Sequence, residues 1–208
     1  MDKIAELKDH HSKIRPQIRR RLKEFERAGS GTDEDIFKEL CFCVLTANTS
    51  AEMCVRAVDA ADEAMISGDI VEISEALRAC GYRYPNKRAE YIAYNKEKIK
   101  DNLKERIASF ADNQKLRDYL AENVKGLGYK EASHFMRNIG FKGLAILDKH
   151  ILSSLAEFDV ISANKSLKNK KEYLEIERKM KRFSKEIEID MDELDLLLWS
   201  RKTGKILK

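Results

Sequence analysis

Apolar residues recur at helical spacing along almost the whole chain. Between residues 3 and 28 they return every three or four positions, which places them in one stripe on one face of a helix. Gly29-Ser30-Gly31 ends this pattern, and Pro16 is its one discordant residue, predicting either a kink or the start of a second helix. The apolar positions of this first stripe are Ile4, Leu7, Ile14, Ile18, Leu22 and Phe25.

The rest of the chain carries the same periodicity in shorter segments. Residues 36–48 have an apolar second half, which predicts a central helix that is buried nearly all round. With only 2 Pro and 9 Gly, the chain lacks the turn-forming residues of a sandwich or barrel of many short strands, so we predict an all-α protein. The further predicted helices cover residues 50–67, 69–79, 89–99, 104–110, 114–122, 131–139 and 149–157, with two more between about 171 and 208.

Composition excludes several classes of protein. No run approaches the roughly 18 apolar residues of a transmembrane helix, and residues 1–6 have no apolar segment typical of a secretion signal, so we expect no membrane association. The 4 cysteines include no Cys-x-x-Cys pair, so we expect no thiolate-bound zinc or iron–sulfur site and no other metal centre. Cys41 and Cys43 lie in an apolar segment and are expected to be reduced core thiols of a cytoplasmic protein.

The charges nearly cancel in number. There are 40 Lys and Arg residues against 36 Asp and Glu residues, for a net charge of +4, which permits a polyanionic partner without requiring one. Acids gather in residues 33–35, 59–63 and 186–193, which we interpret as acidic surfaces. Phosphate binding depends on the cations that reach phosphates and not on the net sum. The basic residues near the motif described next are Arg83, Lys87, Arg88, Lys125, Lys130, Arg137 and Lys149.

The most informative segment is residues 123–152. Lys125-Gly126-Leu127-Gly128 predicts a tight turn between two helices, with Leu127 directed into the core. Such a turn aims backbone N–H groups at the start of the second helix, an arrangement that suits phosphate, although a plain helix–helix turn explains the glycines equally well. Lys130 lies in the first turn of the second helix, and Asp148 follows a short apolar stretch.

This arrangement resembles the helix-hairpin-helix Gly/Pro–Asp superfamily of DNA glycosylases. Within it, the chain is similar to the archaeal-type (type 2) 8-oxoguanine DNA glycosylases/AP lyases over essentially its whole length. The missing iron–sulfur cysteines also fit this branch and argue against the endonuclease III branch. The blocks that carry the resemblance are Cys43–Glu52, Arg83–Ile92, Gly126–Lys130, Lys130–Gly140, Ile146–His150, Leu194–Trp199 and Thr203–Lys208.

The resemblance implies an all-α fold of two subdomains with the active site in the cleft between them. One subdomain would hold residues 1–32 and 141–208. The other, 33–140, would be a helical barrel that ends in the helix-hairpin-helix at about 116–139. The implied function is base-excision repair: a monomer removes 8-oxoguanine from double-stranded DNA and cleaves the strand 3′ of the abasic site by β-elimination. Such an enzyme would work in the cytoplasm, associated with the nucleoid.

The resemblance assigns the chemistry to two residues. Lys130 would attack C1′ of the damaged nucleotide and form a Schiff base, which permits strand cleavage. Asp148 would stabilise the positive charge that develops on the sugar and could transfer protons. Without the resemblance, Lys130 would be interpreted as a solvated lysine on a helix. Asp148 would be interpreted as the N-cap of the following helix, a role that is compatible with catalysis.

Recognition of the flipped base is also assigned by the resemblance. Tyr84 and Trp199 would stack on its two faces, although Trp199 also suits the core of a tail helix. Lys208, through its side chain or its terminal carboxylate, would tell 8-oxoguanine from guanine. The N7–H donor that 8-oxoguanine has and guanine lacks is the group that an acceptor there would read.

Further residues are expected to bind the DNA. Asn48 would enter the gap left by the flipped base or contact the orphaned cytosine, and Arg83 would assist there or bind phosphate. His150 would bind phosphate or cap a helix, whereas His134 reads as a packed helix residue. No cofactor is expected to be required, although hairpin carbonyls in this superfamily can coordinate a monovalent cation. The predicted hairpin contacts to the DNA backbone come from Lys125, Gly126 and Gly128.

Three other interpretations stay open at this point. The same fold could act on another damaged purine. A non-catalytic helix-hairpin-helix module could bind DNA, but it has no use for Lys130 and Asp148 together. A helical scaffold for protein partners would suit the near-neutral charge, but it leaves the matching blocks unexplained.

Overall fold

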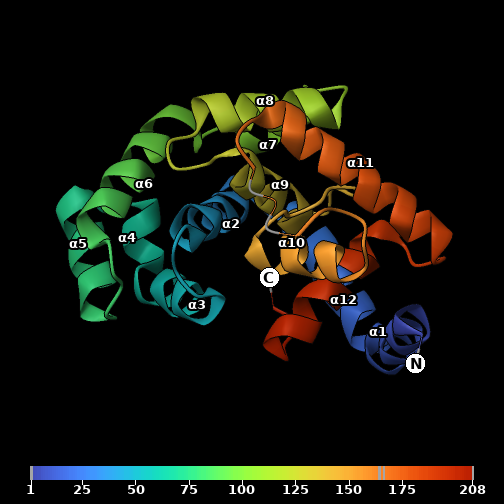
Figure 1. Ribbon diagram of the computed structural model, residues 1–208. Helices are drawn as coiled ribbons and strands as arrows, with labels where there is room; N and C mark the ends of the chain where they lie inside the picture. Colours follow the sequence, from blue (N-terminus) through green and yellow to red (C-terminus); the bar gives the residue numbers. More distant parts are fainter. Residues whose placement is uncertain (1, 164, 166, 208) are drawn as a thin grey trace. The chain divides into compact units, whose positions relative to one another are not determined.

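The computed structural model describes residues 2–163, 165 and 167–207, and every regular element in that part of the chain is a helix. This confirms the predicted all-α class. Most of the predicted helices appear within a few residues of their expected bounds (Figure 1). The helices are α1 (Lys3–Gly29), α2 (Asp33–Thr46), α3 (Ala51–Ala60), α4 (Asp62–Ile66), α5 (Ile70–Ala79), α6 (Pro85–Ile99), α7 (Leu103–Ala108), α8 (Asn113–Asn123), α9 (Tyr129–Asn138), α10 (Lys149–Glu157), α11 (Lys170–Glu186) and α12 (Met191–Thr203).

The chain divides into two compact units. One, the hairpin unit, is Glu26–Ile139, and the other, the terminal unit, joins Met1–Phe25 to Gly140–Lys208. The sequence placed the first boundary later, after residue 32. The difference arises because the last turn of α1 belongs to the hairpin unit: Gly29 lies so close to the backbone of Ile139 that a Cβ atom would overlap its carbonyl.

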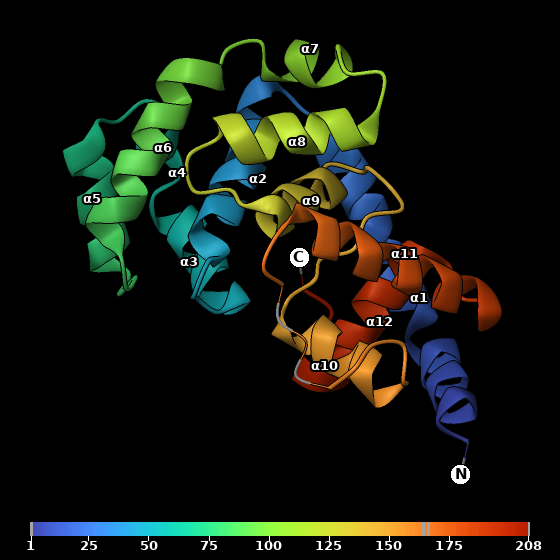
Figure 2. The ribbon, with the colours of Figure 1, turned by 45° about the horizontal axis from the view of Figure 1, so that its top comes forward.

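The hairpin unit is built around α2. Its segment from Ile36 to Leu45 is buried on nearly every side, as the apolar sequence predicts, and helices α3, α4, α6, α7 and α9 pack against it. The first turn of α2 is fixed by a capping box in which Thr32 and Asp35 exchange hydrogen bonds. Helices α5 and α6 lie side by side, as do α8 and α9, which the hairpin connects (Figure 2).

The terminal unit is organised by α12. This helix packs against α10 and α11, and its side chains from Met191 to Leu198 are buried. Glu193 reaches α1, where its carboxylate accepts hydrogen bonds from Arg19 at 2.8 Å and Arg15 at 3.2 Å and lies 2.6 Å from the His11 ring nitrogen. One buried carboxylate therefore holds three basic side chains of α1 in place.

Three sequence interpretations need correction. No second helix begins at Pro16, because α1 is continuous and its buried residues Leu7, Ile18 and Phe25 share one face across that position. The helix predicted over 50–67 is two helices, α3 and α4. They divide at Ala61, just before acids that favour a helix start.

The third correction concerns charge. The acidic run 186–193 is not simply an acidic surface, because Asp192 and Glu193 are buried. Their carboxylates instead accept hydrogen bonds inside the terminal unit, Asp192 from the backbone and Glu193 from α1. A count of charges along the sequence does not reveal which acids are buried, because a carboxylate that is hydrogen-bonded or paired can be buried as well as exposed.

In the portion of the chain that the structure describes, no helix combines the length and the apolar character that a bilayer crossing requires.

Candidate active site

The predicted hairpin is present between α8 and α9. Val124 accepts a backbone hydrogen bond from Leu127 at 3.2 Å, which closes the turn, and Leu127 is buried. Gly126 has a φ of +89°, a conformation that glycine adopts without the strain that a side chain would bring. A Cβ atom there would also lie 2.7 Å from the Tyr91 ring and 3.2 Å from Val44. The hairpin therefore needs glycine at 126 for two reasons. The backbone there is left-handed, and the hairpin packs closely against α2 and α6.

Asn95 of α6 clamps this hairpin, and the sequence interpretation missed it. Its Nδ2 donates to the Lys125 carbonyl and its Oδ1 accepts from the Lys125 N–H, both at 2.9 Å. The side chain is almost fully buried, at 1% exposure. The signal in the sequence is an amide on the apolar face of a helix, at helical spacing between Ile92 and Ile99. A buried amide in such a stripe must find partners, and here they are the backbone of the turn.

The start of α9 presents backbone N–H groups that no side chain caps. Its N-cap is Gly128, which has no side chain to accept from the first turn. By contrast, α3, α8 and α10 each begin at a residue whose side chain accepts one or two of these N–H groups. Open N–H groups and the positive end of the helix dipole together form a binding site for an anion.

Lys130 is the second residue of α9 and is half-buried. Its ammonium lies 2.9 Å from a carboxylate oxygen of Glu131, whose other oxygen accepts the Gly128 N–H at 3.2 Å. Lys130 is also close enough to Cys54 of α3 for its charge to act on the thiol. Burial raises the pKa of the Cys54 thiol to about 12, while the positive charges of Arg88 and Lys130 act in the opposite direction. Lys130, Arg88 and Cys54 thus share one neighbourhood, to which three helices contribute.

Asn48 occupies an exposed turn between α2 and α3 with a left-handed φ of +63°. Two side chains from later in the chain bind carbonyls at this turn. Arg88 donates to the Ala47 carbonyl at 3.0 Å, and Tyr82 donates to the Leu45 carbonyl at 2.6 Å. These bonds satisfy carbonyls at the end of α2 that have no partner within the helix. Arg88 therefore links the Asn48 turn to the surroundings of Lys130.

Arg83 and Tyr84 lie just before α6 on the same unit. The Arg83 guanidinium stacks over the Tyr84 ring at 5.0 Å from its centroid, and both side chains are exposed. Pro85 occupies the first position of α6, which fixes the entry of the chain into the helix. Tyr84 is thus an exposed aromatic ring beside a cation, a combination suited to contact with a base or a phosphate.

Asp148 belongs to the terminal unit, where it is the N-cap of α10. Its Oδ1 accepts from the backbone N–H groups of His150 and Ile151, both at 2.8 Å. Among the described residues no hydrogen bond to its Oδ2 is found, and the side chain is half-buried. One oxygen therefore fixes the carboxylate in place while the other stays available.

His150 and Trp199 lie next to each other beside this cap. Their ring centroids are 6.4 Å apart with an interplanar angle of 83°, an edge-to-face contact between α10 and α12. Trp199 is half-buried, so it is not enclosed within the core of the tail helix. The terminal unit thus brings Asp148, His150 and Trp199 into one region. Lys208, the remaining base-recognition prediction, lies outside the described residues.

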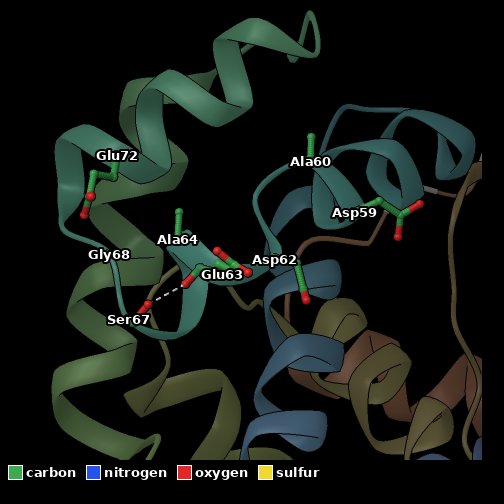
Figure 3. A pocket seen from close by; sticks show the side chains of 8 residues that line it. All are labelled: Asp59, Ala60, Asp62, Glu63, Ala64, Ser67, Gly68 and Glu72. Carbon is green, nitrogen blue, oxygen red and sulfur yellow. Dashed lines mark hydrogen bonds between the residues drawn. The ribbon is translucent and has the colours of Figure 1, made fainter.

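A separate pocket opens on the hairpin unit, but its lining does not suit DNA (Figure 3). Its acids repel phosphate, and several are already engaged: Asp62 pairs with Lys38, and Glu72 caps the N–H of Asp69. Across the described residues, no cluster of three or more His, Cys, Asp and Glu side chains is arranged to hold a metal ion. The pocket is lined by Asp59, Ala60, Asp62, Glu63, Ala64, Ser67, Gly68 and Glu72.

The fold and the hairpin define a helix-hairpin-helix protein, and comparison with known proteins gives its family. A family model described as 8-oxoguanine DNA glycosylase matches residues 18–189. The chain is 45% identical over 197 residues to the 8-oxoguanine DNA glycosylase/AP lyase of Korarchaeum cryptofilum, covering 95% of this chain and 93% of that protein. The chain therefore belongs to the 8-oxoguanine DNA glycosylase family, which confirms the resemblance in the sequence.

Solved structures agree with this assignment. The 8-oxoguanine glycosylase/lyase of Methanocaldococcus jannaschii, in complex with DNA containing 8-oxoguanine, superposes with a TM-score of 0.93 at 37% identity over 100% of both chains. The 8-oxoguanine DNA glycosylase of Thermotoga maritima gives a TM-score of 0.91 at 39% identity, covering 99% of this chain and 98% of that one. The likeness extends over the full length of the chain.

Proposed function

We propose that this protein is a bifunctional 8-oxoguanine DNA glycosylase and AP lyase of base-excision repair. The observation that carries the proposal is the position of Lys130, two residues past Gly128, the glycine N-cap at which the hairpin ends. A phosphate of the DNA backbone bound at this helix start would bring a nucleotide close to the lysine amine. A plain helix–helix turn gives no reason for a lysine there.

The reaction begins with access to the sugar. The damaged nucleotide leaves the base stack, which costs a few kcal/mol. The Lys130 amine, once it has lost its proton, attacks C1′, and the bond from C1′ to the base breaks as the base departs with a proton. Opening of the sugar ring then gives a Schiff base between Lys130 and C1′.

Strand cleavage follows from the Schiff base. Its positive nitrogen acidifies the hydrogen on C2′, and loss of that proton expels the 3′ phosphate by β-elimination. Water then hydrolyses the Schiff base and releases Lys130 for another cycle. Asp148 contributes its free Oδ2, whose negative charge stabilises the positive sugar in the first step and which can accept or donate a proton.

Other side chains are proposed to bind the substrate. Tyr84 and Trp199 stack on the extruded base, and Lys208 reads the N7–H of 8-oxoguanine. Asn48 occupies the position of the lost base or contacts the orphaned cytosine. The backbone contacts would be made by Lys125, Gly126, Gly128, Arg83 and His150.

We propose that the reaction requires no cofactor, because the nucleophile and its electrostatic partner are both side chains. The hairpin offers limited room for a cation. The carbonyls of Val124, Lys125 and Gly128 each already accept one hydrogen bond, from Leu127, Asn95 and Ala132. A monovalent cation there would share these oxygens, binding through their second lone pairs. We further propose that the protein acts as a monomer, associated with the nucleoid in the cytoplasm.

One assay tests the function as a whole. The protein is incubated with duplexes that carry 8-oxoguanine, an abasic site or intact guanine, with and without borohydride. We expect cleavage of the first two duplexes and a covalent adduct only when borohydride is present. Binding without cleavage would point to a non-catalytic DNA-binding module, and cleavage of the abasic duplex but not of the 8-oxoguanine duplex would keep the lyase chemistry while pointing to another damaged base as the substrate.

A further inference from the structure

The segment that leads to Asp148 has an unusual backbone. Residues 143–147 form neither helix nor strand, yet Leu144, Ala145, Ile146 and Leu147 are all buried. Backbone N–H groups in such a segment have no ladder to bind and must find other acceptors. In this structure the acceptors are acidic and phenolic side chains of α11 and α12.

Helix α12 provides two of the acceptors. The Gly143 N–H donates to Asp192 Oδ1 at 2.9 Å, and the Ile146 N–H donates to Asp195 Oδ1 at 3.0 Å. Both carboxylates are nearly inaccessible, at 4% exposure for Asp192 and 2% for Asp195. They lie three positions apart on one helix, which places them on the same face along the segment.

Helix α11 provides the others. The Ala145 N–H donates to Glu177 Oε2 at 2.9 Å, and Glu177 is also buried. The Tyr173 hydroxyl donates to the Ala145 carbonyl at 2.5 Å and accepts from the Leu147 N–H at 3.3 Å. Side chains of two helices thus bind three consecutive peptide groups, from Leu144–Ala145 to Ile146–Leu147.

The last link of this chain is the backbone of Asp148 itself. Its N–H donates to the Ile146 carbonyl at 2.7 Å, and the N–H of that same Ile146 is held by Asp195. The position of Asp148 is therefore set through Ile146 by a buried carboxylate. Burying carboxylates is unfavourable unless charge-assisted hydrogen bonds compensate, so a cluster of three around one short segment is a specific arrangement.

We propose that Asp195, Glu177 and Tyr173 are positioning residues for the reaction, which hold the 143–147 segment so that Asp148 Oδ2 stands at the place where the sugar develops its positive charge. This inference rests on the proposed function. None of the three residues touches the substrate in this scheme. A small displacement of a catalytic group lowers the rate by as much as about a hundredfold, whereas it changes ground-state binding little.

The test compares variants of the full-length protein under single-turnover conditions with a duplex containing 8-oxoguanine. Tyr173→Phe removes the hydroxyl hydrogen bonds to Ala145 and Leu147 with little change of shape, and Asp195→Ala removes the acceptor for Ile146. Asp195→Asn restores an acceptor oxygen and should recover most of the loss. The matched control is Glu193→Gln, a change at another buried carboxylate of α12, whose hydrogen bonds within the described residues go to α1 and not to the segment.

We expect Asp195→Ala and Tyr173→Phe each to lower the single-turnover rate at least tenfold while the dissociation constant of the duplex changes less than about threefold. All rates are measured at a temperature where circular dichroism shows each variant folded. The Glu193→Gln control should keep its rate even though it melts earlier. Equal loss of rate in Glu193→Gln would reduce the effect to general stability and overturn the inference.

A double-variant cycle separates this inference from the proposed function. If Asp195 acts through Asp148, adding Asp195→Ala to Asp148→Asn should cost no further rate. Independent losses that multiply in the double variant would contradict the inference while leaving the role of Asp148 intact. Should Asp148→Asn itself keep the full rate, the proposed role of Asp148 fails, and this inference fails with it. Should Tyr173→Phe and Asp195→Ala both keep the full rate, only this inference fails.

Discussion

Asn95 binds both backbone polar groups of Lys125, with its amide nitrogen on the carbonyl and its amide oxygen on the N–H, each at 2.9 Å. The side-chain amide of Asn95 thus forms the same pair of hydrogen bonds with the Lys125 backbone that a residue of a neighbouring β-strand would form. Its burial means that water cannot replace these bonds if the side chain is lost. The hairpin is therefore rigid because of a residue of α6, in addition to its own glycines.

Replacing Asn95 should loosen the hairpin. We expect Asn95→Ala to lower the free energy of unfolding by about 2 kcal/mol, because two buried backbone groups lose their partners. Duplex binding should weaken as well, about tenfold by fluorescence anisotropy, since the hairpin no longer presents one fixed shape. Asn123→Ala is the control, because the Asn123 side chain is exposed and its one hydrogen bond among the described residues goes to the Tyr119 carbonyl of its own helix. Unchanged binding by Asn95→Ala would show that the clamp does not matter for DNA.

Two glycines of the hairpin unit offer a matched comparison. Gly81 and Gly126 both have positive φ values, +80° and +89°, but only Gly126 is crowded, since nothing lies within 4 Å of a Cβ atom at Gly81. Gly81→Ala should therefore cost roughly 1–2 kcal/mol of stability from backbone strain alone. Gly126→Ala should cost more and should also weaken duplex binding. Similar urea midpoints for the two variants would contradict the close packing of the hairpin against Tyr91.

The loss of the free energy of unfolding at acid pH should depend on Glu193. Burial raises the pKa of this carboxyl, but hydrogen bonds from Arg19 and His11 and the charge of Arg15 outweigh burial and hold the pKa below its ordinary value of 4.5. A lowered pKa means that the folded state binds the proton less readily than the unfolded state. The resulting stabilisation is complete above the ordinary value and is lost as the pH falls through the lowered one.

Urea unfolding between pH 7 and pH 3 measures this effect. We expect Glu193→Gln to cost about 2 kcal/mol at pH 7 and to flatten the decline of the free energy of unfolding toward acid pH. Glu175→Gln is the control, because Glu175 pairs with Lys179 at an exposed site where such pairs contribute little. If the free energy of unfolding of Glu193→Gln declined toward pH 3 as steeply as that of the unaltered protein, Glu193 would not be the source of the pH dependence.

The cysteines should differ sharply in reactivity. Cys41, Cys43 and Cys54 are fully buried, and burial raises the pKa of Cys54 to about 12 and that of Cys41 higher still. Only Cys80 is partly exposed. An aromatic disulfide reagent should therefore titrate one thiol of the folded protein and all four after denaturation. A fast reaction at Cys54 would mean that the neighbourhood of Lys130 is more open than the structure shows.

Local patterns predicted a large part of this structure. The helices follow from apolar spacing, and α10 begins where the sequence indicates, because an aspartate before an apolar helix caps it through its own side chain. The hairpin could be predicted because Gly126 and Gly128 act within a few residues of each other. Features set by neighbours in sequence are those that a sequence pattern can express.

Contacts between distant segments could not be predicted in the same way. Asn95 and Lys125 are far apart in sequence, as are Asp195 and Ile146, and no periodicity links either pair. Asp195 resembles any acid in a charged tail until its burial is known. The continuous helix through Pro16 is a similar case, because the apolar face on both sides of the proline outweighs the loss of one backbone hydrogen bond.

The catalytic assignment is tested most directly by locating the covalent adduct. The protein is trapped with borohydride on a duplex containing 8-oxoguanine, digested, and the modified peptide is identified by mass spectrometry. The mechanism predicts that the adduct lies on Lys130 and that Lys130→Gln forms none, while Lys125→Gln, at an exposed lysine of the hairpin, still traps. Undiminished trapping by Lys130→Gln, with the adduct on another lysine or on the N-terminal amine, would contradict the account.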